Sequence, residues 1–181
     1  MIADKKFGYI ALIGEPNVGK SSILNNLLDK KISIVSHKVQ TTRFRLNGIV
    51  QTGNSQMAFI DTPGICDAKN IKERSYNKVA WRSLHEADIV SLVIDAKKGI
   101  TASTRLIVKR LKLNFGEKTN MIFVINKIDL VDKERIFLLA SRIYQEFGNI
   151  EIFFVSARKG KGFDDFKKWL IINLPESQMA V

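Results

Sequence analysis

The sequence predicts an α/β domain in which helices cover both faces of a mostly parallel, six-stranded sheet. Short apolar runs alternate along the chain with longer segments whose apolar residues recur every three or four positions. This alternation is typical of strand–helix–strand units, whose parallel strands are buried on both faces. The 181 residues suit one domain with its own core.

The strands are expected where the apolar runs are short and continuous. Five buried strands are predicted over 7–13, 57–60, 89–94, 121–125 and 152–155. A sixth strand over 45–52 is expected at the edge of the sheet. Gly53 and Asn54 favour a tight hairpin turn between this strand and the next, which makes the edge pair antiparallel.

The helices are expected between these strands. They are predicted over 20–28, 71–84, 104–113, 133–147 and 163–173. Asp132 is a suitable N-cap for the fourth helix, and Leu174 with Pro175 ends the fifth. We therefore expect a single domain over 1–175, followed by a tail or the start of a linker over 176–181.

The composition indicates an intracellular, basic protein. The net charge of +11 comes from 29 basic and 18 acidic residues, and it favours polyanionic partners such as RNA or an anionic membrane surface. A solvated basic surface without such a partner is the alternative. The single cysteine, Cys66, excludes an internal disulfide and fits a reducing cytosol. No apolar run approaches the roughly 18 residues of a spanning helix, so a cytoplasmic location is expected.

The segment after the first strand matches the phosphate-loop pattern G-x-x-x-x-G-K-[ST]. It consists of Gly14, Glu15, Pro16, Asn17, Val18, Gly19, Lys20 and Ser21. In this pattern backbone N–H groups surround the phosphates, the lysine reaches the β- and γ-phosphates, and the hydroxyl binds Mg²⁺. The predicted strand before it and helix after it are the context that the pattern requires. This motif predicts a nucleoside triphosphate site.

A second motif, Asp61-Thr62-Pro63-Gly64, follows the strand over 57–60. Asp61 at the carboxyl end of that strand can reach the same Mg²⁺ through water. Gly64 offers a backbone N–H to the γ-phosphate, so loss of that phosphate can release the loop. Thr41 or Thr42 can complete the Mg²⁺ shell when GTP is present, although either residue could instead be a β-favouring residue at a strand entrance.

A third motif, Asn126-Lys127-Ile128-Asp129, can identify the base. The Asp129 carboxylate can accept hydrogen bonds from N1–H and the exocyclic amine of guanine, which adenine does not present in that arrangement. Lys127 is expected to lie along the base, and Asn126 to join this loop to the phosphate loop. After the last strand, Ser156 and Ala157 can direct backbone N–H groups toward guanine O6. Together the motifs predict a GTP-binding switch.

With these motifs in this order, the chain resembles the translation-factor-related P-loop GTPases, and more closely the Era family of bacterial ribosome-assembly GTPases. The specific likeness lies in residues 14–21, in 31–36 leading to Gln40-Thr41-Thr42-Arg43, and in 61–65. The resemblance covers residues 7–175. It implies a P-loop GTPase fold, Mg²⁺-dependent hydrolysis of GTP to GDP and phosphate, and small ribosomal subunit assembly with ribosomal RNA as a partner. It further implies a monomer in peripheral contact with the anionic inner membrane surface.

The resemblance also assigns roles residue by residue, with Thr42 preferred to Thr41 as the Mg²⁺ ligand. Metal ligands are expected at Ser21, Thr42 and Asp61, and a direct role in hydrolysis at Lys20, Thr42 and Gly64. GTP contacts are expected from Gly14, Glu15, Pro16, Asn17, Val18, Gly19, Lys20, Ser21, Ser22, Asp61, Thr62, Pro63, Gly64, Asn126, Lys127, Asp129, Ser156 and Ala157.

The chain departs from the family pattern in several places. Members usually carry a basic residue in place of Glu15 and a threonine in place of Ser22. They continue into an RNA-binding KH domain, whereas no GXXG module is present here; we expect either a separated GTPase domain or a short natural protein. Ile65 stands where Ras-like GTPases carry the water-orienting glutamine, so slow intrinsic hydrolysis is expected.

Asn17 offers one way to compensate for the missing glutamine. In similar GTPases an asparagine at this point helps to bind K⁺ beside the phosphates, and the alternative is that Asn17 only braces the loop through hydrogen bonds. Two other functions stay open: a nucleotide-dependent interaction module, and the GTPase domain of a tRNA-modification enzyme or iron transporter. The Gln40-Thr41-Thr42-Arg43 run favours Era over the last two.

Overall fold

One six-stranded sheet forms the centre of the computed structural model, which describes residues 5–28, 46–60, 62, 81, 84–116 and 120–176. The strands are β1 (Lys6–Ile13), β2 (Leu46–Thr52), β3 (Ser55–Ile60), β4 (Ile89–Asp95), β5 (Met121–Asn126) and β6 (Ile152–Phe154). Their order across the sheet is β2-β3-β1-β4-β5-β6. Only β2 and β3 pair antiparallel, through the hairpin turn at Gly53 and Asn54. The predicted fold class is confirmed.

Four α-helices are described: α1 (Lys20–Leu27), α3 (Ala102–Phe115), α4 (Lys133–Phe147) and α5 (Phe163–Ile172). A short 3-10 helix, η2 (Ile128–Leu130), follows β5. The helix predicted over 71–84 lies mostly outside the described residues. Among the described helices, none is both long enough and apolar enough to cross a membrane.

Capping side chains set the starts of α3 and α4. The predicted N-cap of α4 is confirmed, because the Asp132 carboxylate accepts from the Arg135 amide at 2.7 Å. For α3 the predicted start at residue 104 is wrong by two positions. The Thr101 side chain accepts from the Thr104 amide, and the Thr104 hydroxyl accepts from the Thr101 amide, which starts the helix at Ala102. The strand predicted over 57–60 likewise starts earlier, because the β2–β3 pairing continues to Ser55.

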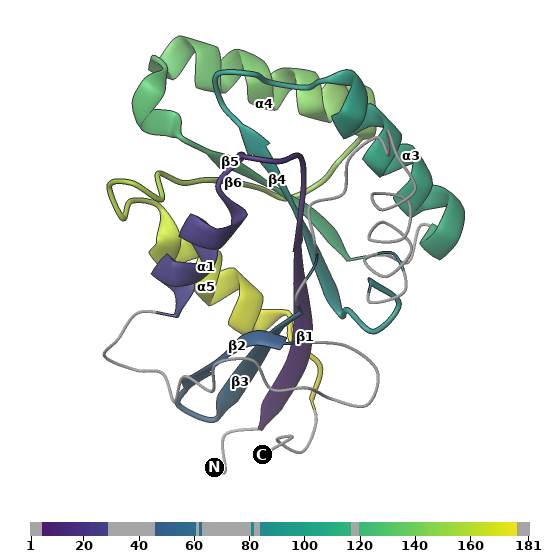
Figure 1. Cartoon of the computed structure of the whole chain (residues 1–181), viewed down its shortest axis with the longest axis vertical. Helices are drawn as coiled ribbons and strands as arrows, with labels where there is room; N and C mark the ends of the chain where they lie inside the picture. Colours follow the sequence, from purple (N-terminus) through teal and green to yellow (C-terminus); the bar gives the residue numbers. More distant parts are fainter. Residues whose placement is uncertain are drawn as a thin grey trace.

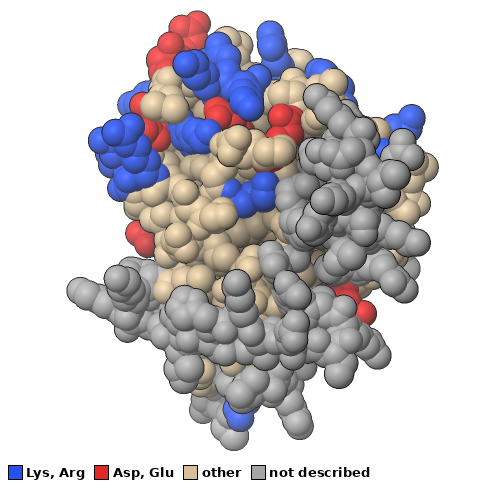
Figure 2. All heavy atoms as spheres, in the orientation of Figure 1, with Lys and Arg blue, Asp and Glu red and all other residues tan. Residues whose placement is uncertain are grey.

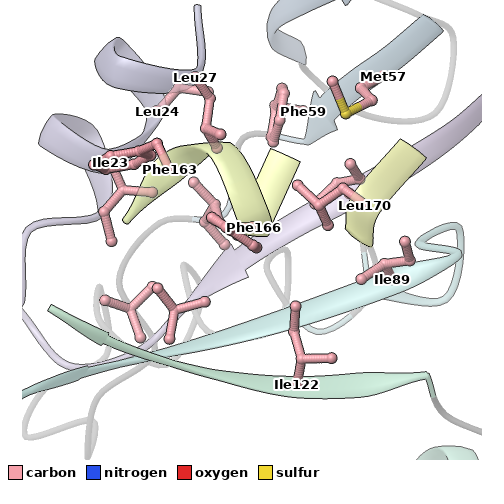
Figure 3. Packing of buried hydrophobic residues seen from close by; sticks show 14 of the residues in the cluster. Ile23, Leu24, Leu27, Met57, Phe59, Ile89, Ile122, Phe163, Phe166 and Leu170 are labelled. Atoms are coloured by element: carbon pink, nitrogen blue, oxygen red, sulfur yellow. The ribbon is translucent and has the colours of Figure 1, made fainter. Parts of the chain in front are cut away.

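The helices cover the two faces of the sheet in pairs, α1 with α5 and α3 with α4 (Figure 1). Alternate residues of β1 enter opposite core layers: Ile10 and Leu12 join the layer beneath α1 and α5, and Ala11 and Ile13 join the other. Figure 3 shows the first layer, with Phe166 and other labelled side chains directed between the helices and the strands. Two-sided burial therefore explains why the strands are continuous apolar runs.

The end of the described chain returns to the first strand. The Phe7 amide donates to the Pro175 carbonyl at 3.2 Å, and Lys6 forms an isolated antiparallel bridge with Glu176. The division of the chain at residue 175 stays a prediction.

Candidate nucleotide-binding site

The phosphate loop connects the end of β1 to the start of α1 through three residues with positive φ. These are Gly14 at 143°, Asn17 at 65° and Gly19 at 100°. A Cβ at Gly14 would lie 2.5 Å from the Val93 carbonyl oxygen, so a larger residue is excluded there by the backbone of β4. Gly19 is the N-cap of α1 and provides no side-chain cap, and the first turn contains no acidic residue. The backbone N–H groups and the partial positive charge at the start of a helix favour an anion at this position.

The Lys20 side chain lies across the phosphate loop. Its ammonium group donates to the carbonyls of Gly14 at 3.0 Å and Glu15 at 2.8 Å. Phosphate oxygens can take over such donors without a large movement of the side chain, because the ammonium already points at the loop. Ser21 and Ser22 follow on the exposed first turn of α1, where the Ser21 hydroxyl is available to a metal ion.

The residues present fit a Mg²⁺–phosphate group in part. The cradle formed by Gly14 and Gly19 and the Ser21 hydroxyl at the helix start are the oxygen-and-amide surroundings that a phosphate-bound Mg²⁺ requires. Thr41, Thr42, Asp61, Pro63 and Gly64, which supply the other expected contacts, lie outside the described residues. Thr62 is described: its hydroxyl donates to the Leu12 carbonyl at 2.5 Å and faces β1. Its GTP contact stays a prediction.

Asn126 joins three loops at the end of β5. Its side-chain amide donates to the Val18 carbonyl of the phosphate loop at 2.9 Å and accepts from the Ala157 amide at 3.0 Å. The residue is 1% exposed, so an unpaired amide here would cost about 1–3 kcal/mol. The predicted link from Asn126 to the phosphate loop is thus present, and the sequence had not indicated its second link, to Ala157. Asn26 of α1 adds a further link to the loop after β6, because its side-chain amide donates to the Ala157 carbonyl at 2.9 Å.

Asp129 is held for an acceptor role. The Ser156 hydroxyl donates to its carboxylate at 2.6 Å. This bond is the main cause that lowers the pKa of Asp129, and the charges of Arg158 and Lys159 act in the same direction, against a smaller effect of desolvation. Asp129 is therefore ionised at neutral pH while its exposed side chain remains accessible. An ionised, accessible carboxylate can accept both guanine donors.

Lys127 connects the loop after β5, residues 126–129, to two other elements. It adopts a left-handed backbone conformation with φ 64°. Its ammonium group donates to the Asn17 carbonyl in the phosphate loop and to the Asp95 carboxylate at the end of β4, both at 2.7 Å. The lysine is thereby fixed beside the phosphate loop by one neutral and one charged acceptor.

Asp95 is a site residue that the sequence analysis missed. Its burial by itself raises the pKa, but hydrogen bonds from Lys127 and from the Lys97 and Lys98 amides, with the charge of Lys127, bring the pKa below its ordinary value. The available signal was its place at the carboxyl end of a buried strand, the argument used for Asp61. We infer that Asp95 orients Lys127.

Glu15 makes a contact that its sequence position did not indicate. Its carboxylate accepts a hydrogen bond from the hydroxyl of Thr101, the N-cap of α3. The side chain therefore bonds the phosphate loop to the start of α3. This pairing gives the acidic side chain a structural role.

Comparisons with known proteins agree with this geometry. The family described as 50S ribosome-binding GTPase matches residues 9–127. GTPase Era of Afipia carboxidovorans is 42% identical over 169 residues, which are 93% of this chain and 54% of that protein. The chain thus spans about half the length of this curated relative.

Solved Era structures are similar as well. A variant of Aquifex aeolicus Era bound to GDP·AlF₄⁻ is 37% identical with a TM-score of 0.79, and the match covers 97% of this chain and 60% of that one. Era in complex with MgGDPNP and part of 16S ribosomal RNA is also 37% identical, with a TM-score of 0.81 and coverage of 98% and 60%. The chain therefore belongs to the Era family of P-loop GTPases. The G domain of the T. maritima FeoB iron transporter, 24% identical with a TM-score of 0.64, shares the fold, and the iron-transporter alternative has less support than Era.

Replacing Asp95 with asparagine should weaken guanine nucleotide binding about tenfold. The substitution keeps the shape and one acceptor oxygen but removes the charge that holds Lys127, and a charged hydrogen bond exceeds a neutral one by roughly 1–1.5 kcal/mol. Titration calorimetry with GDP and Mg²⁺ measures the change. Asp164→Asn, an exposed carboxylate on α5, is the matched control, and equal GDP affinity in Asp95→Asn and wild-type protein would show that Asp95 does not orient Lys127.

Proposed function

We propose that this chain binds GTP with Mg²⁺, hydrolyses it to GDP and phosphate, and uses the cycle as a timed switch in small ribosomal subunit assembly. The observation that carries the proposal is the connected base-reading site. Asn126 and Lys127 both bond to the phosphate loop, and the ionised Asp129 lies two residues further on in η2. These hydrogen bonds join the proposed base-reading residues to the phosphate loop.

The expected contacts divide by chemistry. Asp129 reads the guanine edge, Lys127 lies along the base, and the loop at Ser156 and Ala157 supports O6. The residues from Gly14 to Ser22 surround the phosphates. Ser21, Thr42 and Asp61 would hold Mg²⁺, which would supply positive charge against the phosphates. Lys20, Thr42 and Gly64 act on the γ-phosphate, and its loss releases the segments around Thr42 and Gly64.

The proposed partners follow from the relatives and the charge. One Era relative is solved with 16S ribosomal RNA, the RNA of the small subunit, and this chain carries a net charge of +11. We assign to the chain a ribosomal RNA partner, a monomeric state and a cytoplasmic location with peripheral contact at the inner membrane surface. Affinity for isolated RNA should come from distributed basic charge and fall steeply with salt.

Asp129→Asn should shift the nucleotide preference from GTP toward xanthosine triphosphate. The new amide can donate to the 2-oxo group of xanthine, whereas it loses the two charge-assisted bonds to guanine, worth about 3 kcal/mol together or a hundredfold in affinity. Competition binding with both nucleotides measures the preference, with Asp164→Asn as control. Full GTP preference in the variant would remove Asp129 as the base reader and with it the proposed function.

A monovalent cation should accelerate hydrolysis if Asn17 helps to bind K⁺. Single-turnover GTP hydrolysis should be at least about tenfold faster in K⁺ than in Na⁺ at equal ionic strength. This effect is a fraction of the roughly 10³–10⁵-fold rate increase that a complete arginine finger supplies. Asn17→Ala should erase the difference. Because Asn17 has φ 65°, alanine is strained there, and Asn17→Gly removes the side chain without that strain. Equal wild-type rates in the two salts would eliminate K⁺ as the activator.

Small ribosomal subunits should stimulate the same single-turnover reaction if the chain is a timer. Ile65 cannot polarise water, so a binding partner is a further source of an activating group. The control is an equal concentration of large subunits. Subunit binding that depends on GTP but leaves the hydrolysis rate unchanged would instead favour a nucleotide-dependent interaction module.

A further inference from the structure

A cavity of about 560 Å³ lies between α3 and α4, apart from every residue assigned to the nucleotide site. Its walls come from the loop after β4, from Arg105 of α3 and from α4. Figure 2 shows Lys and Arg atoms gathered at the upper end of the view, where α4 lies in Figure 1. Four of the residues that line the cavity are basic.

The lining is strongly cationic. Lys98, Arg105, Arg135 and Arg142 line the cavity, and Glu146 is the acidic residue among its lining residues. Arg105 binds both oxygens of Glu146, at 2.5 and 3.1 Å. The carboxylate that could neutralise the cavity is thus already paired, and three positive charges remain in excess.

The remaining cations are available to a ligand. Arg135 uses one guanidinium nitrogen to donate to the Lys97 carbonyl at 2.7 Å. Within the described part of the chain, no ion pair involves Lys98, Arg135 or Arg142. Both arginines project from α4 seven residues apart, two turns along one face of the helix. The guanidinium fork of Arg142 can bind two oxygens of a tetrahedral anion, and the other cations of the lining add favourable charge.

The concave shape of the cavity and its apolar lining residues favour a small organic ligand. Ile100, Leu138 and Leu139 form apolar parts of the same lining, which a free inorganic ion does not use. A concave site with convergent charged groups and apolar walls suits a small organic molecule. We propose that the cavity between α3 and α4 binds the phosphate group of a small phosphorylated compound. This inference uses none of the nucleotide-site residues and holds whether or not the chain hydrolyses GTP.

The test uses the full chain saturated with GDP and Mg²⁺, so that the nucleotide site is filled. Inorganic phosphate is the probe, and potassium chloride at equal ionic strength is the reference. Amide chemical shifts of Gly99, Ile100 and Leu139, followed by NMR, should move with phosphate and not with chloride. Arg142→Gln should weaken phosphate binding about fivefold to tenfold. Arg142→Lys keeps the charge but loses the guanidinium fork, so its phosphate affinity should lie between those of Arg142→Gln and the wild type.

Arg110→Gln provides the matched control, because it removes the same charge from α3 at a residue outside the lining. Equal melting temperatures of all variants exclude unfolding as the cause. No phosphate-specific shift, or equal weakening by Arg110→Gln and Arg142→Gln, would overturn the proposal. A single-stranded RNA oligonucleotide forms the second arm: RNA binding that needs Arg142, together with no binding of inorganic phosphate, would also overturn it and assign the cavity to an RNA backbone.

Discussion

The buried side-chain amide of Asn126 is the interaction on which the candidate site depends. Its two hydrogen bonds join the end of β5 to the phosphate loop and to the loop after β6. Because the amide is inaccessible to water, neither bond can be replaced by solvent if one of the loops moves away. A Cβ at Gly19 would lie 2.3 Å from the side-chain amide nitrogen of Asn126. A glycine is therefore required at this position for the approach of Asn126, in addition to any approach of a phosphate. Loops far apart in sequence are thereby fixed as one surface.

Electrostatics give this surface a second layer of organisation. The ionised Asp95 holds the Lys127 ammonium, and the Asn17 carbonyl accepts from the same group. Lys20 is held in a similar way by two carbonyls of its own loop. Both lysines are therefore placed before a nucleotide arrives, and less conformational entropy is lost on binding than for free lysine side chains. One of the two lysines is thus paired with a carboxylate and the other with neutral carbonyls.

Sheet order explains why these groups meet. β1 lies between β3 and β4, and β5 lies beyond β4, so the carboxyl ends of the parallel strands bring 14–20, 95 and 126–129 to one edge. The same order directs α1 and α5 to one face and α3 and α4 to the other. Binding at the edge of an open parallel sheet follows from this topology.

The sequence by itself determined the strands and the described helices, because apolar periodicity is a property of neighbouring residues. The motifs at 14–21 and 126–129 are local for the same reason, and their roles toward a nucleotide stay predictions. Asp132 as N-cap belongs to the same class. Tertiary structure alone decided the contacts between distant residues: Asp95 with Lys127, Thr101 with Glu15, Asn26 with Ala157, and the arginines gathered between α3 and α4. The three bonded pairs are distant in sequence, as Arg105 of α3 is from the arginines of α4, and a lone aspartate or threonine carries no local signal of its partner. The start of α3 shows the same limit on a smaller scale, since periodicity marks the buried face of a helix whereas the cap that begins it is polar and lies outside that pattern.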